Sequence, residues 1–249
     1  MPNQAAKLVG MQKDAANDWH ERWARLNQRV EQACAACGRD RRSVSVLAVS
    51  KTHSADSVRQ AHAVGLSAFG ENYVQEALAK IESLRDLREQ LQWHFIGPLQ
   101  SNKTRAVAEA FDWVHSVDRL KIAQRLSQQR PIGLPALNVC LQVNISAESS
   151  KSGMPPQDVV AVARAVASMP GLRLRGLMAF PQPEDNPQAQ REPHRRLREL
   201  WQQVREAGVE LDTLSMGMSD DLEAAIAEGS TLVRVGTALF GPRQRHDHA

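Results

Sequence analysis

The chain has 249 residues, of which 42% are hydrophobic and 24% are charged, and this is enough to build one large hydrophobic core. Its formal net charge of +3, from 31 Lys and Arg against 28 Asp and Glu, is too balanced for a nucleic-acid-binding surface. No apolar run reaches the length of a membrane span, and residues 1–7 lack the charged-then-apolar order of a signal peptide. We therefore expect a single-domain cytoplasmic protein without nucleic-acid or membrane partners.

Apolar runs typical of strands alternate with helical patterns along the chain. The predicted strands are 44–50, 68–72, 93–97, 113–117, 137–144, 174–180, 213–219 and 231–240. The predicted helices are 17–36, which precedes the first strand, and then 55–64, 73–88, 120–128, 157–168 and 191–207. This alternation predicts an α/β fold, a single (β/α)8 TIM barrel with an extra N-terminal helix. A doubly wound open sheet is disfavoured because no GxGxxG fingerprint follows the first strand.

The two ends of the chain fall outside this pattern. Residues 1–15 are predicted to form a flexible N-terminal extension, residues 16–241 the barrel, and residues 242–249 a flexible tail. His246 and His248 in the tail are a weak metal-binding pair at best, and we expect fraying there instead. No metal site is predicted.

Lys51 is the first candidate functional residue. It follows the apolar run 44–50 and precedes the loop-forming residues 52–54, so it stands at the carboxyl end of a barrel strand, where barrel enzymes carry their chemistry. An amine desolvated there has a lowered pKa and becomes a nucleophile toward aldehydes such as pyridoxal 5′-phosphate, PLP. The alternative is an ordinary strand-end lysine whose ammonium reaches solvent.

The last two predicted strands carry residues suited to binding an anion. Ser219 ends the seventh strand where a helix begins, and Asp220 and Glu223 are predicted to form a capping box there. Gly236 lets the backbone approach a phosphate closely, and the amides of Gly236 and Thr237 with the Thr237 hydroxyl complete a cradle of neutral donors. The alternative is a capped helix beside a glycine that only closes the barrel.

Six motifs in order along the chain carry a family resemblance. They are AVSKT at 48–52, FGENYVQE at 69–76, WHFIG at 93–97 with LQSNK at 99–103, VNIS at 143–146 with KSG at 151–153, LSMGMSD at 214–220 and VRVGTALFG at 233–241. Together they resemble the pyridoxal phosphate homeostasis protein family, whose fold is similar to the N-terminal barrel domain of alanine racemase. The resemblance covers roughly residues 25–241, which makes it more specific than any single motif.

The resemblance implies a role for each matching residue. Lys51 would hold PLP as a covalent internal aldimine, Ser219, Gly236 and Thr237 would bind its phosphate, and Arg234 would face the pyridine nitrogen. Strand alternation also points Arg234 and Gly236 the same way, which places a cation near the ring when the glycine is near the phosphate. The alternative for Arg234 is a surface ion pair.

Further residues have weaker assignments. Ser215 is a second phosphate candidate, and Asn72, together with His94 and His115, is placed to line the cofactor ring; a hydrogen-bonded core histidine is the alternative. Lys103 and Lys151 are competitors of Lys51 for the aldehyde.

The chain is not expected to be a robust enzyme. An arginine cannot donate a full proton to the pyridine nitrogen, so the cofactor remains a poor electron sink. A racemase also needs a second acid/base, which related racemases take from an added β-domain, and no tyrosine closely follows Lys51 as in their motif. No residue is therefore given a catalytic role.

The function predicted is reversible PLP binding in intracellular PLP (vitamin B6) homeostasis, with an effect on amino-acid balance. Acceptors of the cofactor would be PLP-dependent apo-enzymes or free amino acids, and the protein is expected to be a monomer. One alternative is a PLP-dependent enzyme resembling an amino-acid racemase. Another is a regulatory or interaction protein that responds to PLP.

Overall fold

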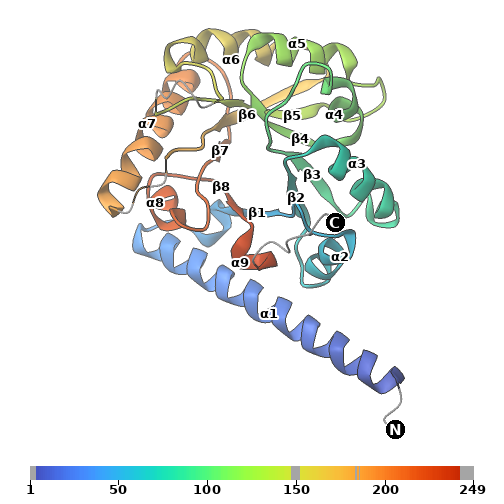
Figure 1. Ribbon diagram of the computed structural model, residues 1–249. Coiled ribbons are helices and arrows are strands. Elements are labelled where there is room, and N and C mark those ends of the chain that lie inside the picture. The colour runs from blue at the N-terminus through green and yellow to red at the C-terminus, as the bar shows by residue number, and fades with distance from the viewer. Residues whose placement is uncertain (1–3, 147–151, 183, 185, 242–249) are drawn as a thin grey trace.

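Eight parallel strands close into a barrel in which β1 pairs with β2 on one side and with β8 on the other (Figure 1). The computed structural model describes residues 4–146, 152–182, 184 and 186–241. The strands are β1 (Ser45–Val49), β2 (Ala68–Glu71), β3 (Gln92–Phe95), β4 (Trp113–Val117), β5 (Leu137–Gln142), β6 (Leu172–Met178), β7 (Thr213–Ser215) and β8 (Leu232–Val235). The predicted single (β/α)8 barrel is confirmed.

Each strand is followed by a helix, and these helices cover the outside of the barrel (Figure 1). The α-helices are α1 (Gln4–Ala36), α2 (Ala55–Ala63), α3 (Val74–Ser83), α4 (Thr104–Ala110), α5 (Leu120–Gln129), α6 (Val159–Ala167), α7 (Pro187–Glu206), α8 (Leu222–Ala227) and α9 (Thr237–Phe240). Short 3-10 helices are η1 (Arg41–Ser43), η2 (Arg85–Leu87) and η3 (Pro156–Asp158). The extra helix α1 lies against α8 and α9 and extends past the barrel. In the described part of the chain, no helix is long and apolar enough to cross a membrane.

The N-terminal helix begins at Gln4, upstream of Asn17, where the sequence predicted its start. Residues 4–16 are rich in Ala, Lys and Gln, which are good helix formers, so the helix continues into the predicted extension. That the extension is flexible stays a prediction. The predicted tail, with His246 and His248, lies outside the described residues.

The predicted strand over 231–240 is wrong beyond Val235, because the chain turns there into the short helix α9. The amides of Leu239 and Phe240 both donate to the Gly236 carbonyl, at 2.9 Å each. The Phe240 ring packs edge-on against Trp19 of α1, with 5.1 Å between ring centroids. Burial of these apolar side chains on α1 outweighs the strand preference of the segment.

The seventh strand is also shorter than predicted, since β7 ends at Ser215 and Ser219 lies in the turn that follows. Gly217 has a φ of +93°, which favours glycine, and its Cβ position would lie 2.5 Å from Ala225. The Arg234 amide still donates to the Gly217 carbonyl at 2.9 Å, so this loop stays attached to β8. Helix α4 was not predicted.

Strand alternation separates the barrel interior from its outer layer. On β1, Ala48 belongs to the large core between strands and helices, whereas Leu47 and Val49 pack with Ile96 and Leu232 in a separate cluster. The interior also holds buried polar side chains, which are described next. Interior apolar residues therefore close the barrel while the polar ones mark a possible site.

Candidate functional site

Lys51 stands at the carboxyl end of β1, half-buried, in the turn that leads to α2. The Ser50 amide donates to the Gly70 carbonyl of β2 at 3.0 Å, which fixes the chain just before the lysine. Just after it, Thr52 has a φ of +66°, the only positive value among the described non-glycine residues. A backbone hydrogen bond thus fixes the chain before Lys51, and a strained residue, Thr52, follows it.

A cluster of buried charges lies beneath this turn, and sequence reasoning did not find it. Lys80 of α3 contacts Glu71 at the end of β2 at 2.5 Å and Glu76 at 3.1 Å. Its ammonium also donates to the Ser50 carbonyl at 2.8 Å, and the Ser50 hydroxyl donates to Glu71 at 2.6 Å. The available signal was the spacing of Glu76 and Lys80, which places both on one face of a helix.

Burial raises the pKa of the Glu71 carboxyl, and attraction to the Lys80 ammonium opposes that rise. Glu71 is fully buried and Lys80 is 5% exposed. A buried carboxylate is costly unless it is paired and hydrogen-bonded, and Lys80 and Ser50 both contact Glu71 Oε1. Glu71 Oε2 is buried without a hydrogen-bond partner in the described residues.

Arg234 is buried inside the barrel, so the alternative of a surface ion pair does not apply. Its guanidinium donates to the Ser215 carbonyl at 2.5 Å, to the Ser215 hydroxyl at 2.8 Å and to the Ala179 carbonyl at 2.8 Å. The ring of Phe180 lies 4.3 Å from its central carbon. Burial lowers the pKa of Arg234 to about 10, which still leaves the group cationic at neutral pH.

The buried Nε of Arg234 has no hydrogen-bond partner among the residues that the structure describes. A buried, unpaired donor on a cation costs free energy unless an acceptor meets it. The fixed guanidinium therefore presents one N–H group that suits a neutral acceptor, such as an aromatic ring nitrogen.

Two histidines extend the arginine contacts across the barrel. His115 Nδ1 lies 2.8 Å from the Ser215 hydroxyl, and His115 Nε2 lies 2.9 Å from His94 Nδ1. Because Arg234 can only donate, the Ser215 hydroxyl accepts a hydrogen bond from it. The hydroxyl then donates a hydrogen bond to His115 Nδ1, and His115 Nε2–H donates one to His94 Nδ1. Burial lowers the pKa of His94 to about 3 and that of His115 well below its usual value, so both rings are neutral.

These contacts bear on two predicted roles. The Ser215 hydroxyl, a phosphate candidate in the sequence, is already engaged by Arg234 and His115. His94 stacks on Trp113 with ring centroids 5.1 Å apart, and it is 2% exposed. The two histidines are therefore hydrogen-bonded core residues in this structure, the alternative left open above.

The predicted phosphate residues lie in the loops after β7 and β8. Gly236 is the N-cap of α9 and Thr237 is its exposed first residue, while Ser219 is half-buried in the turn before α8. A Cβ added at Gly236 would come no nearer than 3.4 Å to Val49, an ordinary contact at the edge of β1. The protein's own packing therefore does not require glycine there, and the space beside it is open to a bound group.

The predicted capping box of Asp220 and Glu223 is wrong. Helix α8 has Asp221 as its N-cap, and Glu223 forms a bidentate pair with Arg29 of α1 at 2.5 and 2.7 Å. A bidentate guanidinium partner is stronger than a single backbone amide, which explains the difference. The turn is fixed by other contacts, described below.

Asp221 holds the Ser219 turn in place. Its carboxylate accepts from the Met218 amide at 2.6 Å and pairs with buried His194 of α7 at 2.9 Å. Although burial raises its pKa, the hydrogen bonds from His194 and Met218 lower the pKa of Asp221 overall. The carboxylate is thereby occupied inside the loop, which reduces its repulsion of an anion bound on the outside.

Asn72 follows β2 directly, and its Oδ1 is buried without a hydrogen-bond partner in the described residues. Gly97 lies so close to the Asn72 backbone that there is no room for a side chain at position 97. Because β1 pairs with both β2 and β8, the residues after these three strands meet in one sector of the barrel mouth. This sector brings together Lys51, Asn72, Gly236 and Thr237.

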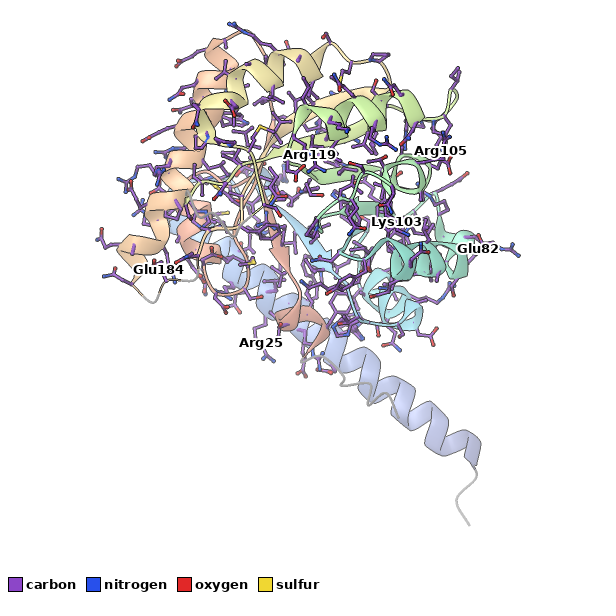
Figure 2. The ribbon with its side chains drawn as sticks, turned by 45° about the horizontal axis from the view of Figure 1, so that its top comes forward. Arg25, Glu82, Lys103, Arg105, Arg119 and Glu184 are labelled. Atoms are coloured by element: carbon purple, nitrogen blue, oxygen red, sulfur yellow. The ribbon has the colours of Figure 1, made fainter. Side chains whose placement is uncertain are left out.

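The competitors of Lys51 stand elsewhere. Lys103 is the N-cap of α4, after β3, and Figure 2 shows it on the side of the barrel that also carries Arg119. Lys151 lies outside the described residues. Next to Lys51, by contrast, His53 stacks on Phe240 of α9 with ring centroids 4.8 Å apart, which ties the lysine turn to the loop after β8.

Comparisons with known proteins agree with this geometry. Residues 23–244 match the family described as alanine racemase, N-terminal domain. The pyridoxal phosphate homeostasis protein of Pseudomonas aeruginosa is 62% identical over 90% of this chain and 95% of its own, and that of Escherichia coli is 50% identical over 91% and 97%.

Solved structures of relatives have a similar fold. PipY of Synechococcus elongatus with PLP bound has a TM-score of 0.78 at 37% identity, covering 90% of this chain and all of its own (100%). Alanine racemase of Corynebacterium glutamicum has a TM-score of 0.65 at 16% identity, covering 91% of this chain and 61% of its own, and it shares the fold. The chain belongs to the pyridoxal phosphate homeostasis protein family.

Proposed function

We propose that this protein binds PLP reversibly through Lys51 and takes part in PLP homeostasis. One observation carries the proposal. The barrel has a lysine at the end of one strand and, on the neighbouring strand, a buried arginine whose Nε lacks a partner in the described residues. The names of the relatives, and the PLP bound to PipY, support the same cofactor.

The residues present fit PLP at each of its functional groups. The Lys51 amine suits the aldehyde, the Arg234 Nε–H suits a neutral pyridine nitrogen, and the unpaired Oδ1 of Asn72 is an acceptor for a ring substituent. The loops with Ser219, Gly236 and Thr237 offer neutral donors for the phosphate dianion.

PLP supplies an electrophilic aldehyde that forms imines with amines. Lys51 would hold the cofactor through its Nζ, which would act as the nucleophile of the site. Because imines exchange with primary amines, an amino acid or a client protein could take the place of Lys51. Binding of this kind retains the cofactor and still permits its transfer.

Arg234 favours this carrier function over catalysis. Its pKa, though lowered to about 10, leaves it a hydrogen-bond donor that does not transfer a full proton to the ring. Tyr73, the sole tyrosine of the sequence, is 58% exposed at the start of α3, which is a poor environment for a general acid or base. Arg234 and Tyr73 therefore do not favour the racemase alternative. The cytoplasmic location, the acceptors and the monomeric state remain predictions.

Borohydride reduction of the PLP-treated protein, followed by peptide mass mapping, tests the proposal. We expect one pyridoxyl group on Lys51, and we expect Lys51→Ala to lose both the adduct and the visible absorption band. Lys103→Ala is the matched control and should keep both. A pyridoxyl group found chiefly on another lysine of the native protein would show that the site is wrong.

A further inference from the structure

We infer that Glu76 and Lys80 are positioning residues for Lys51, because they hold the peptide groups on its two sides. The inference rests on the proposed function and names residues that determine how well Lys51 reacts. Lys80 Nζ donates to the carbonyl of Ser50, the residue before Lys51, at 2.8 Å. The amide of Thr52, the residue after it, donates to Glu76 Oε1 at 2.6 Å.

The two contacts belong to one ring of interactions. Glu76 and Lys80 are one helical turn apart on α3 and pair at 3.1 Å, so the carbonyl before Lys51 and the amide after it are joined through a single ion pair. Lys80 is itself fixed by buried Glu71 at 2.5 Å. A lysine side chain has many rotamers, and a fixed backbone restricts where its amine can reach.

The backbone at Thr52 is strained, and the contacts from Glu76 and Lys80 help to hold it in this conformation. A β-branched residue with a φ of +66° is unfavourable and persists only when its surroundings determine it. Among the described atoms the Thr52 hydroxyl is buried without a partner, so it does not supply this restraint. The His53 amide donates to the Ser50 carbonyl at 3.1 Å and closes the turn, and the bond from the Thr52 amide to Glu76 adds a second restraint. Without it, the turn is expected to relax and Lys51 to lose its direction.

Three substitutions at position 76 separate hydrogen bonding from charge. Glu76→Gln keeps an acceptor at the same reach and removes the charge, whereas Glu76→Asp keeps the charge and withdraws the acceptor from Thr52. Glu76→Ala removes both. Glu82→Ala is the matched control, since Glu82 lies on the same helix with an exposed side chain and a loose contact to Arg85 at 3.5 Å.

Two ligands distinguish positioning from a general structural effect. PLP reports covalent capture, followed by its absorption band and by borohydride trapping at Lys51. Pyridoxine 5′-phosphate has an alcohol in place of the aldehyde, so it reports non-covalent binding at the same site. Thermal melting of each variant without ligand reports folding.

We expect Glu76→Ala and Glu76→Asp to lower the rate of capture at Lys51 about tenfold or more, and Glu76→Gln to stay within about threefold of the wild type. Pyridoxine 5′-phosphate affinity should change less than about twofold in all three. Adding Thr52→Gly to Glu76→Ala should recover part of the rate, because glycine adopts positive φ without strain.

The inference is overturned if Glu76→Asp captures PLP as fast as the wild type, or if it loses pyridoxine 5′-phosphate binding in the same proportion. Glu76→Asp decides this even if Glu76→Ala does not fold. Failure of the proposed function looks different, since wild-type protein would then show no adduct on Lys51 at all.

Discussion

The two sides of the barrel mouth are stabilised by different kinds of interaction. The turn that carries Lys51 rests on buried charges, Lys80 and Glu71 with Glu76 beside them. The loops after β7 and β8 are held by backbone hydrogen bonds and by carboxylates, Asp221 and Glu223, that are already paired with His194 and Arg29. A single reacting atom needs a fixed direction, whereas a phosphate needs neutral donors. The difference matches the two roles that we propose, covalent attachment on one side and anion binding on the other.

The largest expected effect comes from removing the buried cation. Lys80→Met should leave Glu71 buried without its partner and lower the free energy of unfolding by about 3 to 5 kcal/mol. Arg59→Met, which breaks the exposed pair with Asp86, is the control and should change little. Urea denaturation monitored by circular dichroism measures both. If both substitutions change the free energy of unfolding equally little, the buried pair of Lys80 and Glu71 contributes no more to stability than a surface pair.

Acid should weaken the barrel interior on the arginine side. The pKa of His94 is lowered to about 3 from a usual 6.5, so the unfolded chain takes up a proton at mildly acidic pH and the folded protein does not. Stability is therefore fully present above pH 6.5 and is lost as the pH falls towards 3, by about 3 kcal/mol between pH 7 and pH 4. The free energy of unfolding, measured by urea denaturation at each pH, should depend less steeply on pH in His94→Gln than in the wild type. An unchanged slope in that variant would assign the effect to other groups.

Gly236→Ala tests the anion side without disturbing the fold. The added methyl meets only Val49, at 3.4 Å, so the melting temperature should stay close to that of the wild type. If the backbone approaches the phosphate here, the methyl should reduce PLP affinity by about 1 to 3 kcal/mol through overpacking. Equilibrium titration of the variant with PLP measures this. Full affinity in a folded variant would move the phosphate away from Gly236.

Ser219→Ala should have the smallest effect. It removes one neutral donor and should cost about 0.5 to 1.5 kcal/mol of PLP affinity, with little change for pyridoxal, which has no phosphate. The comparison of the two ligands is the measurement. Equal affinity of the wild type for pyridoxal and its phosphate would rule out an anion site in these loops.

The parts of the site that sequence could predict are those encoded within one segment. Lys51 follows an apolar run, so local pattern was enough to place it at a strand end. Arg234 alternates with Gly236, so local pattern was enough to place both on one face of a strand. Contacts between distant segments were not accessible in this way. Lys80 meets Ser50 across 30 positions and Glu223 meets Arg29 across 194, and no periodicity reports such pairs.

Local preference also failed where burial outweighed it. Residues 236–240 continue the apolar run of a predicted strand, yet they form α9, which packs against α1. Glu223 has the spacing of a capping box, yet a distant guanidinium competes for it. In both places the tertiary partner, absent from the local pattern, decides the structure.

The contacts of Phe240 have a consequence for the nascent chain. This ring touches Trp19 of α1 and His53 beside Lys51, so the first, second and last parts of the described chain meet at one side chain. Lys51 leaves the ribosome well before β8 and Phe240 do. The contact between His53 and Phe240 therefore cannot form until β8 and α9 have emerged, so the lysine turn gains this support only after most of the barrel has been synthesised.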